Sequence, residues 1–233
     1  MKIVQVSHSD IPGERFSGYE LTKALSAQGM DCAMLVKNKK SQCNYVHNMS
    51  VNLVKPFLSH LDAIGKEYQL YNFLSPWNHI ITNNEIWREA DIVHYQLIRA
   101  FPISVTDLPM LFQDKKCIWT MHNFWPVTGG CIHPLGCERY VKNCQDCIRM
   151  DLEQHPKYIY SEKELEMKRK TFENINIDIV VSNDFMKKAI EKYQIFRKNK
   201  IHVIPFGLHD EEFGEDEKKR ERFRRQYNIK EKV

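Results

Sequence analysis

The sequence predicts an α/β fold built on a Rossmann-like, doubly wound parallel sheet. Short apolar runs rich in Val and Ile alternate with longer segments of helical periodicity along the 233 residues. Most of the apolar runs end in polar residues, as expected of an open parallel sheet whose ligands bind outside the carboxyl ends of its strands. Hydrophobic residues make up 42% of the chain, which is enough for a sizeable core and excludes an intrinsically disordered protein.

Six apolar runs have the length and composition of buried strands. The expected strands are Ile3–Ser7, Cys32–Lys37, Ile92–Tyr95, Cys117–His122, Asp178–Ser182 and Ile201–Pro205. Because their apolar residues are nearly continuous, we expect helices to cover both faces of the sheet. We assign residues 1–207 to this domain and residues 208–233 to a linker followed by a basic helix.

Three helices can be placed between the strands. The segment YELTKALSAQG shows helical spacing of its apolar residues and ends in Gly29, which is expected to supply a left-handed cap. A second helix is expected over residues 161–174, where Ser161 opens a capping-box motif, SEKE. A third follows the fifth strand, with Asn183 or Asp184 near its N-terminus.

The net charge of +4 does not indicate a nucleic-acid partner. Residues 214–233 carry eight Lys or Arg against five Asp or Glu, so most of the excess charge lies in the last segment and the body of the chain is nearly neutral. No apolar run approaches the roughly 18 residues of a membrane span, and the N-terminus reads directly into a strand. We therefore expect a cytoplasmic protein.

Polar residues at the predicted strand ends are the first candidates for function. They include His8, His94, His122, Asn123 and Ser182. A metal site built from the three histidines is disfavoured, because they lack a short ligand spacing such as His-x-x-x-His and no carboxylate stands beside them. Hydrogen bonding to a polar ligand is the favoured interpretation, and a buried histidine that serves only the core is the alternative.

A Cys-rich loop at residues 122–150 follows the fourth predicted strand. Four of its cysteines show the spacing C-x5-C-x6-C-x2-C: Cys131, Cys137, Cys144 and Cys147. Four thiolates at this spacing can close a tetrahedral structural zinc site, in which His133 could replace one of them. Disulfides, a redox Cys-x-x-Cys pair and unligated thiols are the alternatives, and a cytoplasmic setting argues against disulfides.

The stretch WTMHNFWPVTGGCIHPLGCERYVKNCQDC, from Trp119 to Cys147, resembles a signature of the family 4 glycosyltransferases, in the branch of the colanic acid and capsular polysaccharide enzymes. Further matching segments, among them Asp91–His94 and Val203–Gly207, extend the resemblance over almost the whole chain. The family fold is GT-B, in which two Rossmann-like domains face each other. The resemblance implies that this chain is the N-terminal, acceptor-side half of a retaining enzyme, and that a C-terminal donor-binding domain is its partner.

The resemblance also implies roles for individual residues. His122 takes the position of the histidine that reaches the donor sugar and is the expected catalytic residue. The loop holding Arg15, Ser17 and Gly18 takes the position of a Gly-Gly pair whose amides meet the diphosphate of a nucleotide sugar.

Two departures limit this transfer of roles. Ser17 replaces one glycine of the pair, and Asn123 replaces an Asp and cannot act as a general base. His94, Asn123 and Ser182 are the expected acceptor or substrate contacts.

The resemblance further implies a glycan or lipid-linked acceptor, reached at the inner face of the membrane. Residues 55–80 combine aromatic and basic residues and could contact that membrane or simply pack as a helix. A noncatalytic module that binds a glycan or a protein is the competing class, favoured by the changed Gly pair and the missing second half. A dehydrogenase is disfavoured because no Gly-x-Gly-x-x-Gly follows the first strand.

Overall fold

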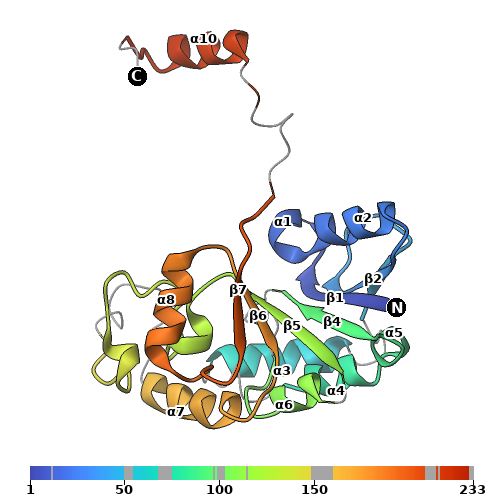
Figure 1. Cartoon of the computed structure of the whole chain (residues 1–233), viewed down its shortest axis with the longest axis vertical. Coiled ribbons are helices and arrows are strands. Elements are labelled where there is room, and N and C mark those ends of the chain that lie inside the picture. Colours follow the sequence, from blue (N-terminus) through green and yellow to red (C-terminus); the bar gives the residue numbers. More distant parts are fainter. Residues whose placement is uncertain are drawn as a thin grey trace.

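The chain forms a seven-stranded parallel sheet flanked by helices (Figure 1). The computed structural model describes residues 1–11, 13–49, 55–67, 75–96, 98, 103–113, 115–147, 160–207, 214 and 216–230. The strands are β1 (Lys2–Ser9), β2 (Asp31–Asn38), β3 (Val46–Asn48), β4 (Ile92–Tyr95), β5 (Lys116–Met121), β6 (Asp178–Val181) and β7 (Lys200–Val203). All six expected strands are therefore confirmed, with ends that differ by one or two residues. The edge strand β3 was not expected, because three residues are too few to show a periodic pattern.

The strand order places a topological switch point in the sheet. The order is β3-β2-β1-β4-β5-β6-β7 and every neighbouring pair is parallel. The chain winds outward in one direction from β1 to β3 and in the other from β4 to β7, so the switch point lies between β1 and β4. Residues that directly follow β1, β4 and β5 consequently converge at one place, which is where ligands bind in open α/β sheets.

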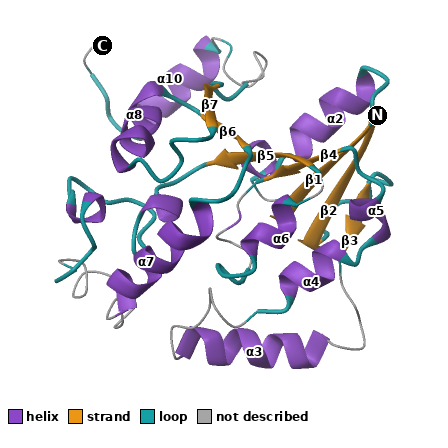
Figure 2. Ribbon diagram, turned by 60° about the horizontal axis from the view of Figure 1, so that its bottom comes forward, coloured by secondary structure: helices purple, strands orange, loops and turns teal. Residues whose placement is uncertain are grey.

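Helices cover both faces of the sheet, as the apolar strands require. In the views of Figures 1 and 2, α1 and α2 lie on one face and α4, α6 and α7 on the other. The helices are α1 (Glu14–Ser17), α2 (Tyr19–Ala27), α3 (Lys55–Glu67), α4 (Trp77–Thr82), α5 (Glu85–Arg88), α6 (Leu108–Phe112), α7 (Ser161–Phe172), α8 (Asp184–Tyr193) and α10 (Glu217–Gln226). Two short 3₁₀ turns, η2 (Trp125–Val127) and η3 (Arg139–Val141), lie in the loop after β5.

Aromatic side chains fill the core beneath β4, β5 and β6. The Trp119 ring packs against Phe112, Phe172 and Phe196, with ring centroids 5.7 to 6.2 Å apart. Trp119, Phe172 and Phe196 are each fully buried. This cluster joins α6 and α7 to the sheet, so the loop between β5 and α7 begins and ends on a rigid foundation.

The helix caps confirm two expectations and correct a third. Gly29 follows α2 with φ +80°, and Asn183 caps α8 by accepting a hydrogen bond from the Met186 N–H at 2.9 Å. The capping box at Ser161 was a wrong expectation, because Ser161 is the first helical residue and its hydroxyl donates to the Cys144 carbonyl at 3.0 Å. The Ser161 hydroxyl therefore binds the neighbouring loop instead of capping its own helix.

The segment after the sheet contains the expected basic helix. It is α10, and none of its residues is buried. Residues 208–213, 215 and 231–233 of the expected linker and helix lie outside the described residues, so the division of the chain at residue 207 stays a prediction. Within the described residues, no helix combines the length and the apolar character that crossing a membrane requires.

Candidate functional site

A buried polar network joins three neighbouring strands at the carboxyl edge of the sheet. Gln96 follows β4, and its amide lies between β1 and β5. Its Nε2 donates to Gln5 Oε1 at 3.1 Å and lies 3.2 Å from His94 Nε2, while its Oε1 lies 2.9 Å from His122 Nε2. His94 Nε2 also lies 2.6 Å from the Thr120 hydroxyl. One amide thus ties the expected catalytic histidine to the sheet.

The amide of Gln96 fixes which nitrogen of His122 carries the proton. An amide oxygen can only accept a hydrogen bond, so the Nε2 atom that faces it must be the protonated nitrogen. The lone pair of the neutral ring then lies on Nδ1. Nδ1 is buried and has no hydrogen-bond partner among the described residues, which is also true of Gln5 Nε2 in the same network.

Burial keeps both histidines of the network neutral at physiological pH. It lowers the pKa of His122 from 6.5 to about 4. Burial, together with the proximity of His122, lowers the pKa of His94 from 6.5 to about 4 as well. Both rings therefore act as neutral hydrogen-bonding groups and carry no fixed positive charge at pH 7.

Two phenylalanines cover the ring of His122. Phe206 stacks on it, with ring centroids 5.5 Å apart and planes 12° apart, and Phe16 meets it edge-on at 5.8 Å. The two phenyl rings also contact each other at 4.9 Å. Phe16 comes from α1 and Phe206 from the segment after β7, so residues far apart in the sequence close over the same imidazole.

The loop expected to meet phosphates lies against this network. Gly18 has φ +88°, and a Cβ there would lie 2.9 Å from Gln5 Oε1 and 3.0 Å from Gln96 Cγ, so only glycine fits. Ser17 is buried, and its hydroxyl donates to the Asp10 carbonyl at 2.7 Å. The side chain of Arg15 lies outside the described residues. The structure thus brings Ser17 and Gly18 together with His122.

Asn123 and Ser182 take part in local hydrogen bonds. Asn123 Oδ1 accepts from the Trp125 N–H at 2.9 Å, which starts η2 immediately after the histidine. The Ser182 hydroxyl accepts from Asn183 Nδ2 at 3.1 Å at the end of β6. Their roles as substrate contacts stay predictions, whereas the part of Asn123 in shaping the loop is visible.

A buried lysine on α7 anchors the loop that follows His122. Lys168 is 0% exposed, and its ammonium lies 2.5 Å from Glu164 Oε1. It donates to the carbonyls of Trp125 and Thr128 at 2.8 and 2.9 Å and lies 4.0 Å from the centroid of the Trp125 ring. The three donors of the ammonium therefore face three oxygens, so the charge is fully compensated inside the protein.

A second contact fixes the same loop to the start of α7. A Cβ on Gly129 would lie 2.2 Å from the Ser161 carbonyl oxygen, so the backbones approach as closely as glycine allows. The Gly129 N–H donates to Cys144 Sγ at 3.3 Å, while the Ser161 hydroxyl donates to the Cys144 carbonyl. Cys144 is thereby joined to both sides of this contact.

The cysteines of the loop carry reduced thiols, and burial strongly affects that of Cys144. None of the seven cysteines forms a disulfide, and all seven lie in described segments. Burial raises the pKa of the Cys144 thiol to about 11; the hydrogen bond from the Gly129 N–H opposes this rise, and the charges of Cys131, Cys147 and Cys137 add to it. Among the described residues, no three His, Cys, Asp or Glu side chains converge on a point where an ion could be held as they lie.

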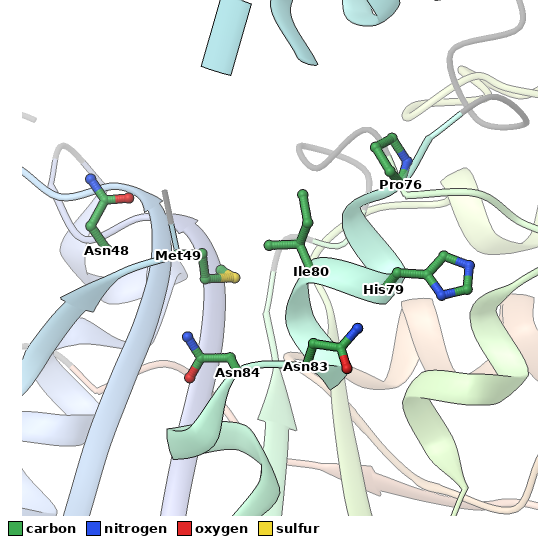
Figure 3. Close-up of a pocket in the computed structure, with 7 residues that line it drawn as sticks. All are labelled: Asn48, Met49, Pro76, His79, Ile80, Asn83 and Asn84. Atoms are coloured by element: carbon green, nitrogen blue, oxygen red, sulfur yellow. The ribbon is translucent and has the colours of Figure 1, made fainter. Parts of the chain in front are cut away.

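A separate cavity of about 390 Å³ opens between β3 and α4. Figure 3 shows its lining residues, which are Asn48, Met49, Pro76, His79, Ile80, Asn83 and Asn84. Two of the amides are engaged in local structure, since Asn84 Oδ1 accepts from the Ile86 N–H at 3.0 Å and Asn83 Oδ1 accepts from Arg88 at 2.7 Å. None of the residues expected to act in function lines this cavity, so we place the candidate site at the sheet edge.

The sequence analysis assigned no role to several residues of the site, among them Gln96, Lys168, Phe16 and Phe206. Gln96 stands two positions after His94 and therefore on the same side of the extended chain, which is a signal that the sequence contains. Lys168 occupies the apolar stripe of α7 at helical spacing from Leu165 and Phe172, where a lysine is unexpected. The contact between Phe16 and Phe206 could not be predicted from neighbouring residues in the sequence, because the tertiary fold brings the two together.

The fold and the site together define a Rossmann-like domain with a buried polar network at its topological switch point. The model of glycosyltransferase family 4 matches residues 17–212, which is most of the chain. The chain belongs to this family, and its sheet is that of the N-terminal half of a GT-B fold. No match is found among curated proteins.

Replacing Lys168 by Met should lower the free energy of unfolding by about 3 to 5 kcal/mol, because it leaves the Glu164 carboxylate and two carbonyls without their buried partner. Lys170→Met is the matched control, since Lys170 pairs with Glu166 at the same helical spacing but is 74% exposed. Urea unfolding followed by circular dichroism measures both. Equal and small losses in the two variants would contradict the anchoring role.

Proposed function

We propose that the chain is the acceptor-side domain of a retaining glycosyltransferase that moves a sugar from a nucleotide diphosphate to a glycan or lipid-linked acceptor in polysaccharide biosynthesis. The observation that carries the proposal is the neutral His122 at the sheet edge, with Nδ1 lacking a partner beside the Gly18 loop. Family membership supports glycosyl transfer in general. The resemblance to colanic acid and capsular enzymes supports the narrower class.

In this proposal each group has a limited task. Nδ1 of His122 accepts a hydrogen bond from a sugar hydroxyl, while Gln96 keeps the ring in the required tautomer. The backbone at Ser17 and Gly18, which leads into α2, faces the diphosphate of the donor. A neutral imidazole suits this task, because it orients a hydroxyl without holding a charge next to the reacting sugar.

The proposed partners follow from the same assignment. A donor-binding domain supplies the other wall of the site, and the acceptor is presented at the cytoplasmic face of a membrane. The α3 helix supports a membrane contact, because Phe57 is 60% exposed while Leu58 is buried. Asn123 cannot act as a base, so deprotonation of the acceptor falls to another group, such as the departing phosphate.

His122→Ala should lower transfer roughly 10- to 100-fold, the loss expected for one hydrogen bond to a reacting sugar, without unfolding the domain. Transfer is measured with the chain alone and with the chain joined to a donor-binding domain, using a panel of nucleotide sugars and a glycolipid extract. His202→Ala is the control, because His202 pairs with Asp178 at an exposed position.

Activity only in the joined protein, reduced in the His122 variant, supports the proposal. Wild-type activity in neither sample, with glycan binding by the single chain, would replace it with the noncatalytic binding module. Melting temperatures of both variants establish that any loss of activity is not a loss of folding.

We further propose that Cys131, Cys137, Cys144 and Cys147 bind a structural zinc ion. Their spacing supports the site, as do the effect of the other three charges on the pKa of Cys144 and the N–H that Gly129 directs at Cys144 Sγ. Because no three ligands converge among the described residues, binding requires their side chains to turn toward a common centre. The ion would close the loop that Lys168 and Ser161 already hold at its base.

Metal analysis of the purified chain should find about one zinc per chain. Cys144→Ser should lose most of this zinc, whereas Cys32→Ser should keep it, because Cys32 lies on β2 outside the loop. Thiol titration distinguishes the alternatives. A metal-free wild-type chain, with its loop thiols either titratable or paired as disulfides, would overturn the zinc site.

A further inference from the structure

His122 cannot reach a substrate in the arrangement of the structure. Its Nε2 is engaged by Gln96, and Nδ1 is buried without a partner among the described residues. Phe206 stacks on the ring at 5.5 Å between centroids, and Phe16 meets it edge-on at 5.8 Å. A sugar hydroxyl can therefore reach Nδ1 only if part of this cover moves.

The cover is made of side chains that are themselves partly exposed. Phe16 is 44% exposed and Phe206 is 36% exposed, so the outer surface of each ring faces solvent. Exposed phenylalanines gain less from burial than core residues, and they contact mainly each other and the imidazole. Displacing one of them costs far less than opening the core.

The two phenylalanines differ in how firmly their backbones are held. Phe16 is followed by Ser17, whose buried hydroxyl donates to the Asp10 carbonyl at 2.7 Å, and by the tightly packed Gly18. Asp10 is itself held, because its carboxylate accepts the backbone N–H groups of Lys40 and Ser41 at 2.9 and 2.8 Å. Phe16 therefore rests on an anchored support.

Phe206 stands on a looser segment. The last ladder hydrogen bond of this segment runs from the Ile204 N–H to the Val181 carbonyl at 2.8 Å, two residues before Phe206. Gly207 follows, with no atom within 4 Å of the position of a Cβ. A change in the direction of this segment moves Phe206 directly.

We propose that Phe16 and Phe206 form an aromatic gate over His122, with Phe16 as its fixed side and Phe206 as the side that swings away to admit a sugar. The inference rests on the proposed function for the identity of the ligand. It adds that access to the imidazole is controlled by residues 204–207, directly after β7, so that the position of this short segment and the state of the site are coupled.

Chemical modification of His122 tests the gate without requiring activity. Diethyl pyrocarbonate acylates neutral imidazole, and His122 is neutral at pH 8, so its rate of modification reports access to the ring. Peptide mass spectrometry follows His122 and the exposed His202 in the same sample. In the wild-type chain His122 should react at least about tenfold more slowly than His202.

The variants separate the two sides of the gate. Phe206→Ala should raise the rate at His122 about tenfold, and Phe16→Ala should raise it less, while the rate at His202 stays constant. Phe57→Ala is the matched control, because Phe57 is exposed on α3 and should change neither rate. A constant His202 rate and an unchanged melting temperature exclude unfolding as the cause of faster modification.

Several results would overturn the gate. They are a His122 that reacts as fast as His202 in the wild-type chain, a rate that neither phenylalanine variant changes, or a larger effect of Phe16→Ala than of Phe206→Ala. The result is independent of the transfer assay. Gated access without transferase activity would overturn the proposed function alone, and transfer with an ungated His122 would overturn the gate alone.

Discussion

The amide of Gln96 is the constraint on which the site depends. It is buried at the switch point of the sheet, donates to Gln5 on β1 and accepts from His122 after β5. The amide donates through Nε2 and accepts through Oε1. Its contact with Gln5 on the sheet sets which end faces His122, and the accepting oxygen then requires the proton of the imidazole to lie on Nε2. The pKa of His122, held near 4 by burial, keeps that state constant over the physiological range.

The loop after His122 is held from the side opposite to the network. The Lys168 ammonium donates to the carbonyls of Trp125 and Thr128 and pairs with Glu164. Gly129 permits direct contact between the loop backbone and α7. The histidine therefore sits between two rigid attachments, the amide on the sheet and the ammonium on the helix. Phe206 is less firmly attached, which is why we assign movement to it and not to the imidazole.

The sequence was sufficient for six of the seven strands because buried parallel strands are nearly continuous apolar runs, and His122 could be placed at a strand end for the same reason. Ser161 shows the limit of local patterns, since its hydroxyl serves Cys144 in place of the helix start. Gln96 and Lys168 acquire their roles from partners tens of residues away. In the sequence, each of these residues is visible only as a polar residue at an unexpected position. The periodicity of the sequence does not identify its distant partner.

The most direct measurement is the tautomer of His122, read from long-range ¹H–¹⁵N correlation spectra of the histidine-labelled protein. The account predicts a neutral ring with its proton on Nε2 throughout the range from pH 6 to 8, and loss of this single form in Gln96→Leu, where nothing fixes the ring. A proton on Nδ1, or a charged ring at pH 7, would contradict the claim that Gln96 and burial prepare Nδ1 to accept a hydrogen bond.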